Sequence, residues 1–399
     1  MNADPKNFAR IANRMNDIAP FHVVEIFNRV GELQRAGHSV INLCIGEPDF
    51  PTPQPMLDAA AKALQSGRFP YTPSLGIPEL REAIANFYWY RYQVTIAPAR
   101  IAVTAGASAA LLLTMGVLIN PGDQVLLTDP GYPCNHQFVR AMGGKPIGVP
   151  VDSSSDYQLN ASLIEKNWNS NTVAALVASP ANPTGTMIHQ DAMADLISAV
   201  HQRSGRLIVD EIYLALSYGE TATTALTLSD EVFIINSFSK YFQMTGWRLG
   251  WIVAPSAYIP AIERLSQNLF ISNSAIAQHA ALAGFEPATL EILETRRKEF
   301  QARRDYLIPA LKELGFGIPI TPEGAFYVYA DCSEFTADSY RFAWDMLEKS
   351  GVAVTPGVDF GVYQAERHVR FSYCASLEQL REGIARIGRY LGKQSVYQP

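Results

Sequence analysis

Short apolar runs alternate with longer segments of helical periodicity through the middle of the chain. The runs that predict strands cover residues 101–104, 124–128, 146–149, 173–178, 207–209, 232–236 and 249–253. Most of them end in a polar or Gly/Pro-rich loop, and such an alternation is typical of parallel strands connected by helices. We therefore predict an α/β fold with a mostly parallel, seven-stranded central sheet covered by helices on both faces.

The two ends of the chain show a different pattern. Residues 7–36 are predicted to be helical with a break at Pro20, and a short strand follows near 40–43. A long helix is predicted near 290–314, followed by strands at 325–329 and 369–373. Ser376 and Gln379 have the spacing of a capping box before a last helix. We predict that the ends form one smaller α+β domain: residues 1–48 are an N-terminal arm and part of it, 49–290 are the large domain, and 291–399 complete the small domain.

The composition is that of an ordinary globular protein, with 48% hydrophobic and 18% charged residues. The net charge of −6 gives no electrostatic reason to expect nucleic acid or an anionic membrane surface as a partner. No apolar stretch approaches the roughly 20 residues that span a bilayer, and the polar start is not typical of a secretory signal. A cytoplasmic location is therefore expected.

Two groups of residues invite a chemical interpretation but have simpler ones. The scattered cysteines lack metal-ligand spacing, so no metal site is predicted and they are expected to be reduced thiols in or near the core: Cys44, Cys134, Cys332 and Cys374. A basic cluster is interrupted by acidic residues and accompanied by leucines at helical spacing, which predicts a solvated helix face: Arg296, Arg297, Lys298, Arg303 and Arg304.

Lys240 is the strongest candidate for chemistry. It follows the apolar run 232–235 in the segment Ser237-Phe238-Ser239-Lys240, so a partly dry loop would favour its neutral amine, which can form a Schiff base. Two serine hydroxyls and the guanidinium of Arg248 supply donors that a phosphate group requires. The alternative for a lone lysine at a strand end is a solvated surface charge.

Polar residues that follow other predicted strands support the chemical interpretation. Asp210 follows the run 207–209. If Lys240 carries pyridoxal phosphate as a Schiff base, the carboxylate of Asp210 could keep the ring nitrogen of that cofactor protonated. The alternatives are a structural ion pair or a metal site with Glu211. Asn182 follows the run 173–178, and its amide, with the Tyr213 hydroxyl, could hold the phenolic oxygen of that cofactor. Turn chemistry explains the Asn-Pro-Thr-Gly segment about equally well.

Three further features are weaker signals. Gly106, Ala107 and Ser108 open a predicted helix, where backbone N–H groups bind anions, although short turns commonly use such residues. Tyr132 could stack on a flat ring or simply pack in its turn. Arg370 is an isolated guanidinium on a predicted strand and could bind a carboxylate with two hydrogen bonds. Dinucleotide-binding, P-loop, serine-hydrolase and zinc-protease motifs are missing from the sequence.

Together these segments resemble those of the class I/II aminotransferases, which are aspartate-aminotransferase-like, fold-type I enzymes dependent on pyridoxal phosphate. The resemblance covers nearly the entire chain. The segments that carry it, in order, are Gly46-Glu47-Pro48-Asp49-Phe50, Tyr71-Thr72 with Gly76 and Leu80-Arg81, Asn182-Pro183-Thr184-Gly185, Asp210-Glu211-x-Tyr213, Ser237-x-Ser239-Lys240, Arg248-x-Gly250 and Arg370.

The resemblance implies a role for each candidate. Lys240 would bind pyridoxal 5'-phosphate as a Schiff base and move a proton during catalysis, Asp210 would pair with the ring nitrogen, and Tyr132 would stack on the ring. Asn182 and Tyr213 would bind the phenolic oxygen. The phosphate would be held by Ala107, Ser108, Ser237, Ser239 and Arg248, helped by Tyr71 from a second subunit of a homodimer. The substrate α-carboxylate would be received by the Gly46 backbone, Asn182 and Arg370.

The function that the resemblance implies is transfer of an amino group from an L-amino acid to a 2-oxo acid by a ping-pong route. A C–S β-lyase or another α-carbon eliminase is the alternative on the same fold. A cofactor-sensing regulator would need an added DNA-reading module, for which the segment before Gly46 is short and insufficiently basic. Ser108 stands where some aspartate-specific relatives have a lysine, which weakens the case for a dicarboxylic donor. Phe21, Tyr71 and Phe270 are compatible with alanine-like, aliphatic or aromatic substrate side chains, and the alternative for all three is a packing role.

Overall fold

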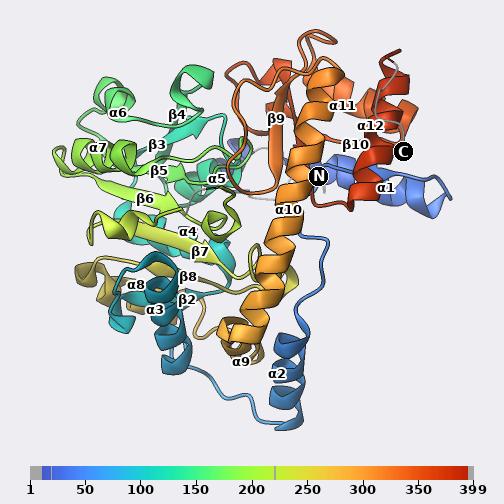
Figure 1. Cartoon of the computed structure of the whole chain (residues 1–399). Helices are drawn as coiled ribbons and strands as arrows, with labels where there is room; N and C mark the ends of the chain where they lie inside the picture. The colour runs from blue at the N-terminus through green and yellow to red at the C-terminus, as the bar shows by residue number, and fades with distance from the viewer. Residues whose placement is uncertain (1–10, 19, 220–221, 394–399) are drawn as a thin grey trace, which may run out of the picture.

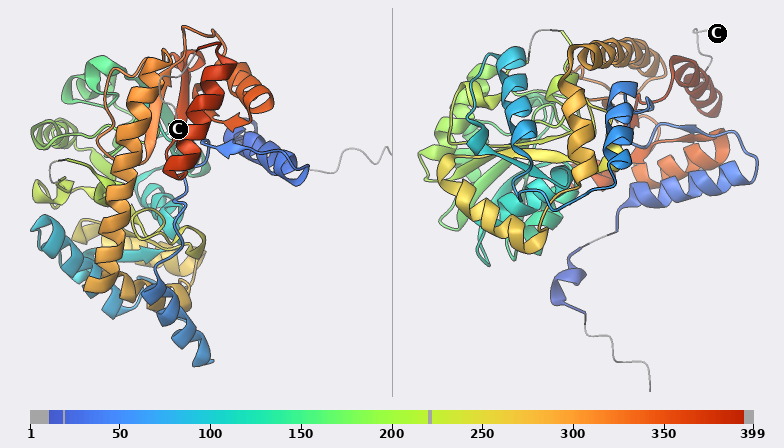
Figure 2. Two further views of the ribbon diagram at one scale, coloured as in Figure 1. Left: turned by 45° about the vertical axis from the view of Figure 1, so that its right-hand side comes forward. Right: turned by 90° about the horizontal axis from the view of Figure 1, so that it is seen from below.

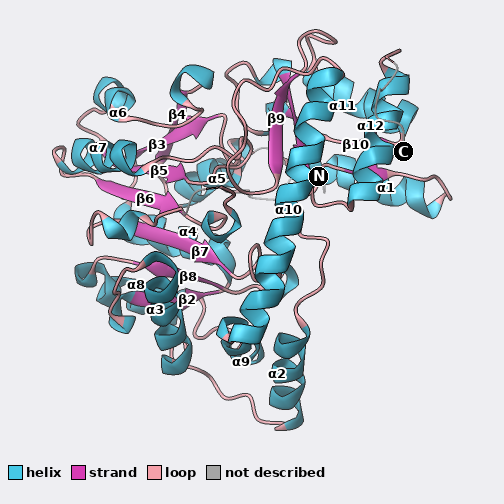
Figure 3. Ribbon diagram, viewed as in Figure 1, coloured by secondary structure: helices cyan, strands magenta, loops and turns pink. Residues whose placement is uncertain are grey.

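A central sheet organises the fold. The computed structural model describes residues 11–18, 20–219 and 222–393. Its large sheet has the order β2-β8-β7-β6-β5-β3-β4 and is parallel except for β8, which runs antiparallel to both of its neighbours (Figure 3). The strands are β2 (Ile101–Thr104), β3 (Gln124–Asp129), β4 (Lys145–Pro150), β5 (Thr172–Ala178), β6 (Arg206–Asp210), β7 (Phe233–Ser237) and β8 (Gly250–Val253). The predicted fold class is confirmed, and each strand overlaps a predicted run.

The sheet is apolar on both faces because helices cover both. Successive side chains of a strand point to opposite faces. On β3, Val125 and Leu127 accordingly belong to one core cluster and Leu126 to the other. One face packs against α4 (Gly106–Leu118), α5 (Cys134–Ala141) and α8 (Ile259–Leu269). The other packs against α3 (Pro78–Tyr92), α6 (Ala161–Asn167), α7 (Gln190–His201) and α9 (Ala275–Leu282), the last of which also packs on α2 (Gln54–Gln65).

The two chain ends meet in a second group of elements (Figures 1 and 2). β1 (Ile41–Asn42) pairs in parallel with β10 (Val352–Ala353), and a separate antiparallel sheet has the order β11-β12-β9. Its strands are β9 (Tyr327–Asp331), β11 (Thr355–Pro356) and β12 (His368–Ser372), accompanied by α1 (His22–Arg35), α11 (Ser339–Ser350) and α12 (Leu377–Tyr390). The predicted capping box at Ser376 and Gln379 is present at the start of α12. None of the helices within the described ranges combines the length and apolarity of a membrane span.

The boundaries of several terminal elements differ from the prediction. Within the predicted helix 7–36, residues 7–10 lie outside the described ranges, Asn13–Asn16 form a short 3-10 helix, and α1 begins only at His22. Phe21 is extended, as expected just after a proline that interrupts the helical pattern. The strand predicted at 325–329 begins at Tyr327, because Ala325 adopts a left-handed conformation that a strand cannot include.

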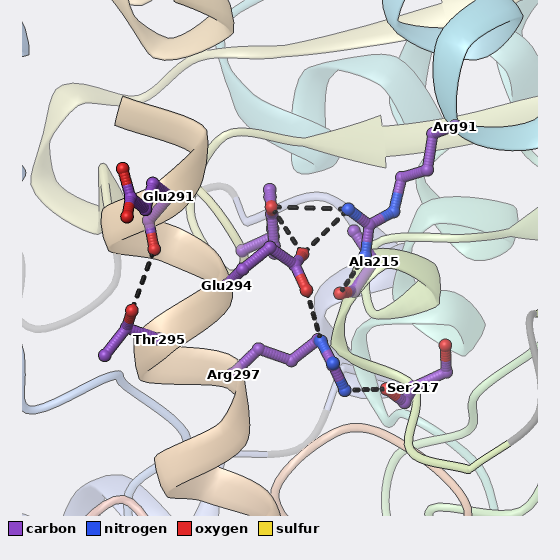
Figure 4. A network of polar contacts seen from close by, with 8 residues as sticks. Arg91, Ala215, Ser217, Glu291, Glu294, Thr295 and Arg297 are labelled. Atoms are coloured by element: carbon purple, nitrogen blue, oxygen red, sulfur yellow. Dashed lines mark hydrogen bonds and ion pairs between the residues drawn. The ribbon is translucent and has the colours of Figure 1, made fainter. Parts of the chain in front are cut away.

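The long helix α10 (Pro287–Glu313) corrects the interpretation of the basic cluster. We predicted a solvated face, but only 3% of the Arg303 side chain is exposed, and its guanidinium donates to Asp49 at 2.7 Å. Arg297 donates to Glu294 and to the Ser217 carbonyl (Figure 4). The helical spacing correctly indicates a helix but cannot show that distant acceptors cover its arginines.

Candidate active site

The candidate site is a cavity of about 310 Å³ at the carboxyl ends of the parallel strands. This is the edge at which open α/β sheets bind ligands. The predicted site residues that line it are Gly46, Ala107, Ser108, Tyr132, Asn182, Asp210, Tyr213, Ser237, Ser239, Lys240, Arg248 and Arg370. Phe21 also lines the cavity. The large sheet, the antiparallel sheet and the start of α1 therefore meet around one space.

Lys240 projects into this cavity from the loop after β7. Its Nζ donates to the Gly46 carbonyl at 2.7 Å and lies 5.8 Å from the centre of the Tyr213 ring. Burial lowers the pKa of Lys240 to about 8, so a substantial share of the amine is neutral near pH 8. A Cβ on Gly46 would collide with the Tyr327 hydroxyl, which explains why a glycine supplies this carbonyl.

The loop that carries Lys240 is held in place by the side chains that flank the lysine. Phe238 and Phe242 on either side of the lysine are buried in the core. The hydroxyl of Tyr241, the residue after the lysine, donates to Glu294 on α10 at 2.8 Å. The same Glu294 carboxylate accepts from Arg91 on α3 at 2.8 Å, as Figure 4 shows. These contacts hold the backbone of the lysine loop in place while its side chain reaches the cavity.

Asp210 stands at the end of β6 with only 4% of its surface exposed. One carboxylate oxygen accepts the Ile212 N–H at 3.1 Å. Burial raises the pKa of Asp210 to about 7, although this N–H and the charge of Lys240 oppose the rise. Glu211 turns to a different set of partners, the Thr224 hydroxyl and the Ala225 N–H. Across the described residues no group of three or more acidic, histidine or cysteine side chains could hold a metal ion.

One end of the cavity is rich in donors. α4 begins at Gly106 with a positive φ of 79°, and Ala107 and Ser108 of its first turn, where N–H groups lack partners within the helix, line the cavity. A Cβ at Gly250 would lie 2.9 Å from the Ala107 nitrogen, which shows how tightly the strand passes this turn. The hydroxyls of Ser237 and Ser239 and the guanidinium of Arg248 line the same space. Such a set of donors suits a phosphate group.

A buried guanidinium also lines the cavity. Arg370 on β12 is 5% exposed and donates to Asn182 Oδ1 at 2.8 Å and to the Cys44 carbonyl at 2.6 Å. Its carbon Cζ lies 4.2 Å from the centre of the Tyr327 ring. Its Nε has no hydrogen-bond partner in the structure, so the arginine keeps an unused donor. A guanidinium is the cation best suited to pair with a carboxylate.

Tyr327, Asp359 and Phe360 are among the lining residues that the sequence reasoning missed. The Tyr327 and Tyr213 hydroxyls lie 2.9 Å apart, and Phe360 packs over the Arg370 guanidinium at 4.8 Å. Asp359 lines the cavity beside Phe360. These residues belong to β9 and to the loop before β12, whose local pattern resembles ordinary core packing. The sequence signal that could have indicated one of them is the predicted strand 325–329, which contains Tyr327 but was given no role in the site.

Two other candidates lie elsewhere. Tyr71 is 81% exposed and does not line the cavity of its own chain. Phe270 packs against the core on the α4 side of the sheet. The Tyr132 ring does line the cavity and meets Phe21 edge-to-face at 6.4 Å between ring centres. Three of the four cysteines, Cys44, Cys332 and Cys374, are buried, Cys134 is partly buried, and all are free, as predicted.

The comparisons with known proteins agree with this fold. The model of the family described as aminotransferase class I and II matches residues 38–387. The chain belongs to that family. It is therefore an enzyme that transfers an amino group from an amino acid to a 2-oxo acid.

Similar proteins cover the chain almost completely. A valine–pyruvate aminotransferase of Mycobacterium tuberculosis is 35% identical over 96% of this chain and 99% of its own. A (5-formylfuran-3-yl)methyl phosphate transaminase of Methanocaldococcus jannaschii is 36% identical over 96% of this chain and 100% of its own. The solved structure of an aspartate aminotransferase from Thermus thermophilus with maleate has a TM-score of 0.90 at 33% identity, covering 96% and 100% of the two chains.

Proposed function

We propose that the chain is a pyridoxal 5'-phosphate-dependent aminotransferase that works by a ping-pong route as a homodimer. The observation that carries the proposal is the convergence of three groups on one cavity: the Lys240 amine, the Asp210 carboxylate and the Arg370 guanidinium. They come from different sheets and loops of the fold. No simple packing requirement brings a lysine, a buried carboxylate and an arginine with an unused donor to the same space.

The residues present fit the cofactor. The donors at the start of α4, with Ser237, Ser239 and Arg248, suit its phosphate, and the glycine at position 250 leaves room for that turn. Asp210, whose burial disfavours its charged form, suits a cationic ring nitrogen that would stabilise the carboxylate. The Asn182 amide and the Tyr213 hydroxyl suit the phenolic oxygen, and the Tyr132 ring suits the face of a flat heterocycle.

When bound, pyridoxal phosphate supplies an aldehyde for the amino group and an aromatic ring that withdraws electrons from the substrate α-carbon. The neutral amine of Lys240 accepts a proton from the substrate α-carbon, and its ammonium form returns one. Asp210 holds the proton at the ring nitrogen. Arg370 orients the substrate through its carboxylate, with Asn182 fixing the guanidinium at 2.8 Å.

A homodimer accounts for Tyr71. Its side chain is largely exposed in the single chain, and so are the apolar side chains of Phe69, Leu269 and Ile271. Exposed apolar groups of this kind favour burial against a second copy. In our proposal the tyrosine reaches the phosphate of the neighbouring subunit. The domain division at residues 48 and 290 is part of the same proposal and is supported by the meeting of the two chain ends at β1 and β10.

Reconstitution tests the proposed function directly. Purified protein incubated with pyridoxal phosphate is expected to gain a visible absorbance band, because burial lowers the pKa of the Lys240 amine to about 8 and its neutral form can react with the cofactor aldehyde. Adding a preferred L-amino acid should convert this band to that of the amine form of the cofactor. A 2-oxo acid should restore the first band. A protein that binds no cofactor would refute the proposal, while release of pyruvate from cystathionine without the amine form would indicate a C–S β-lyase.

Replacing Arg370 is expected to weaken substrate binding. Arg370→Lys keeps the charge but loses the planar pair of donors, so KM for the amino donor should rise by about 100-fold while kcat changes less. Steady-state kinetics with one donor and one acceptor measure both constants. Arg341→Lys, an exchange on the exposed side of α11, is the matched control and should leave both unchanged. An unchanged KM for Arg370→Lys would show that the carboxylate binds elsewhere.

A further inference from the structure

The wall of the cavity that the start of α1 forms is apolar. Phe21, Val23 and Val24 contribute this wall, and Ile45 and Phe360 continue it. In the proposed function the polar groups of the cavity already bind the cofactor and the substrate α-carboxylate. The remaining surface therefore lies where the substrate side chain must go, and it offers contacts to carbon atoms.

The charged groups of the cavity also favour an uncharged substrate side chain. Lys240, Arg248 and Arg370 are the cations that line it in the part of the chain that the structure describes, and each has a task in the proposed function. The other ionisable lining groups include the carboxylates of Asp210 and Asp359. A second carboxylate on the substrate would find no spare cation among these lining residues. Desolvating an unpaired charge is unfavourable.

Asp359 holds the apolar wall in place. Its Oδ1 accepts the His22 N–H at 2.8 Å and its Oδ2 accepts the Val23 N–H at 2.7 Å. These are the first N–H groups of α1, which have no partner within the helix, and the N-cap residue Phe21 has no side-chain oxygen to serve them. The negative charge of the carboxylate also interacts favourably with the positive end of the helix dipole. The first turn of α1 is thus fixed by a residue 337 positions away.

Asp359 also belongs to a loop that is hydrogen-bonded to the end of β3 and the turn that follows it. It is 7% exposed. The carbonyl of the next residue, Phe360, accepts the Gly131 N–H at 2.8 Å, and Asp129 accepts the Val362 N–H at 3.0 Å. The loop 359–362 therefore ties the start of α1 to the turn after β3 that carries Tyr132. A movement of this loop would shift the apolar wall relative to the ring-binding side of the cavity.

We propose that Asp359 is a positioning residue that sets the first turn of α1 as a side-chain subsite for amino donors with an uncharged, apolar side chain. The inference rests on the proposed function and names its substrate class: donors of the size of leucine or phenylalanine, in preference to alanine and to aspartate or glutamate. Asp359 contacts the backbone of α1 and acts on the substrate only through the side chains of that turn.

The test follows the half-reaction of the cofactor-loaded enzyme with leucine, phenylalanine, alanine, aspartate and glutamate. For each donor, the rate of loss of the cofactor band against donor concentration yields a maximal rate and an apparent dissociation constant. The maximal rate divided by the apparent dissociation constant should be about tenfold or more higher for leucine than for alanine, as expected for a pocket that distinguishes methylene groups. Aspartate and glutamate should fall below alanine.

Asp359→Asn isolates the positioning role. The amide can accept only one of the two α1 N–H groups and turns a donor toward the other, so the wall should loosen and the apparent dissociation constant for leucine should rise by about tenfold. The constant for alanine, whose side chain is too short for the wall, should change by less than about threefold. Maximal rates should be unchanged. Val24→Ser, on the half-exposed part of the same turn, tests the wall without altering its anchor and should also weaken leucine binding selectively.

Glu348→Gln is the matched control. Glu348 also binds α1, through Arg29 at 2.7 Å, but on the surface away from the cavity, and its loss should leave every donor unchanged. Equal weakening of all donors in Asp359→Asn, or wild-type turnover of aspartate as fast as leucine, would overturn the inference while leaving the aminotransferase function intact. Failure of every donor to convert the bound cofactor would instead overturn the proposed function, and the subsite with it.

Discussion

Lys240→Ala is expected to abolish transamination. The substitution removes both the amine that binds the cofactor and the group that moves the proton at the substrate α-carbon, so kcat should fall by about 10⁴-fold or more. The Gly46 carbonyl also loses its donor. The backbone of the loop at residue 240 should keep its position, because Tyr241 keeps its hydrogen bond to Glu294. Steady-state turnover and the visible spectrum after reconstitution measure the two losses separately.

The control distinguishes loss of chemistry from loss of folding. Lys145→Ala removes an exposed lysine at the start of β4, remote from the cavity lining, and should keep full turnover and the same cofactor band. Lys240→Ala should unfold at a temperature similar to that of the cofactor-free wild type, since it exchanges a partly buried amine for a small apolar group. Turnover near the wild-type level in Lys240→Ala would refute the assignment of this lysine.

The parts of the fold that the sequence predicts best are those governed by local periodicity. Strands of the large sheet are buried on both faces and therefore appear as unbroken apolar runs. The carboxyl-edge rule then placed Asn182, Asp210 and Lys240 together, and the structure has them on one cavity. No single residue at these loops would have been decisive, because turns commonly contain Asn, Gly and Ser.

The parts that escaped prediction depend on contacts between distant segments. Asp359 serves the N–H groups of His22 and Val23, and no periodicity of either segment records that pairing. Arg303 has the spacing of a solvated helix face yet is covered by Asp49 from a loop 254 positions earlier. The break predicted at Pro20 agrees with the start of α1 at His22, but before Pro20 the described residues hold only the short 3-10 helix Asn13–Asn16, because helix formation depends on tertiary packing as well as on pattern.

Asp210→Asn is expected to have opposite effects on the cofactor-free and the cofactor-loaded enzyme. Burial raises the pKa of Asp210 to about 7, above that of an unfolded aspartate, so the stability contributed by its protonated form is present at low pH and is lost as pH rises through 7. Near pH 8 the charged, buried carboxylate destabilises the cofactor-free fold by an amount on the order of 4 kcal/mol at most. The amide removes this cost, and the cofactor-free variant should be the more stable protein at pH 8, with the difference shrinking toward pH 5.

In the loaded enzyme the same substitution is expected to be harmful. The carboxylate that is unfavourable alone would be the partner of the protonated ring nitrogen, and an amide cannot hold that proton, so kcat should fall by about 10³-fold. Thermal unfolding with and without cofactor at several pH values, together with turnover, measures both effects. Glu211→Gln is the control: this neighbouring carboxylate is also buried, burial raises its pKa to about 8, and it faces Thr224 instead of the cavity. It should show the stability change without the loss of turnover. If Asp210→Asn retained wild-type kcat, the carboxylate would be a structural group only, and its raised pKa would be a consequence of burial with no part in catalysis.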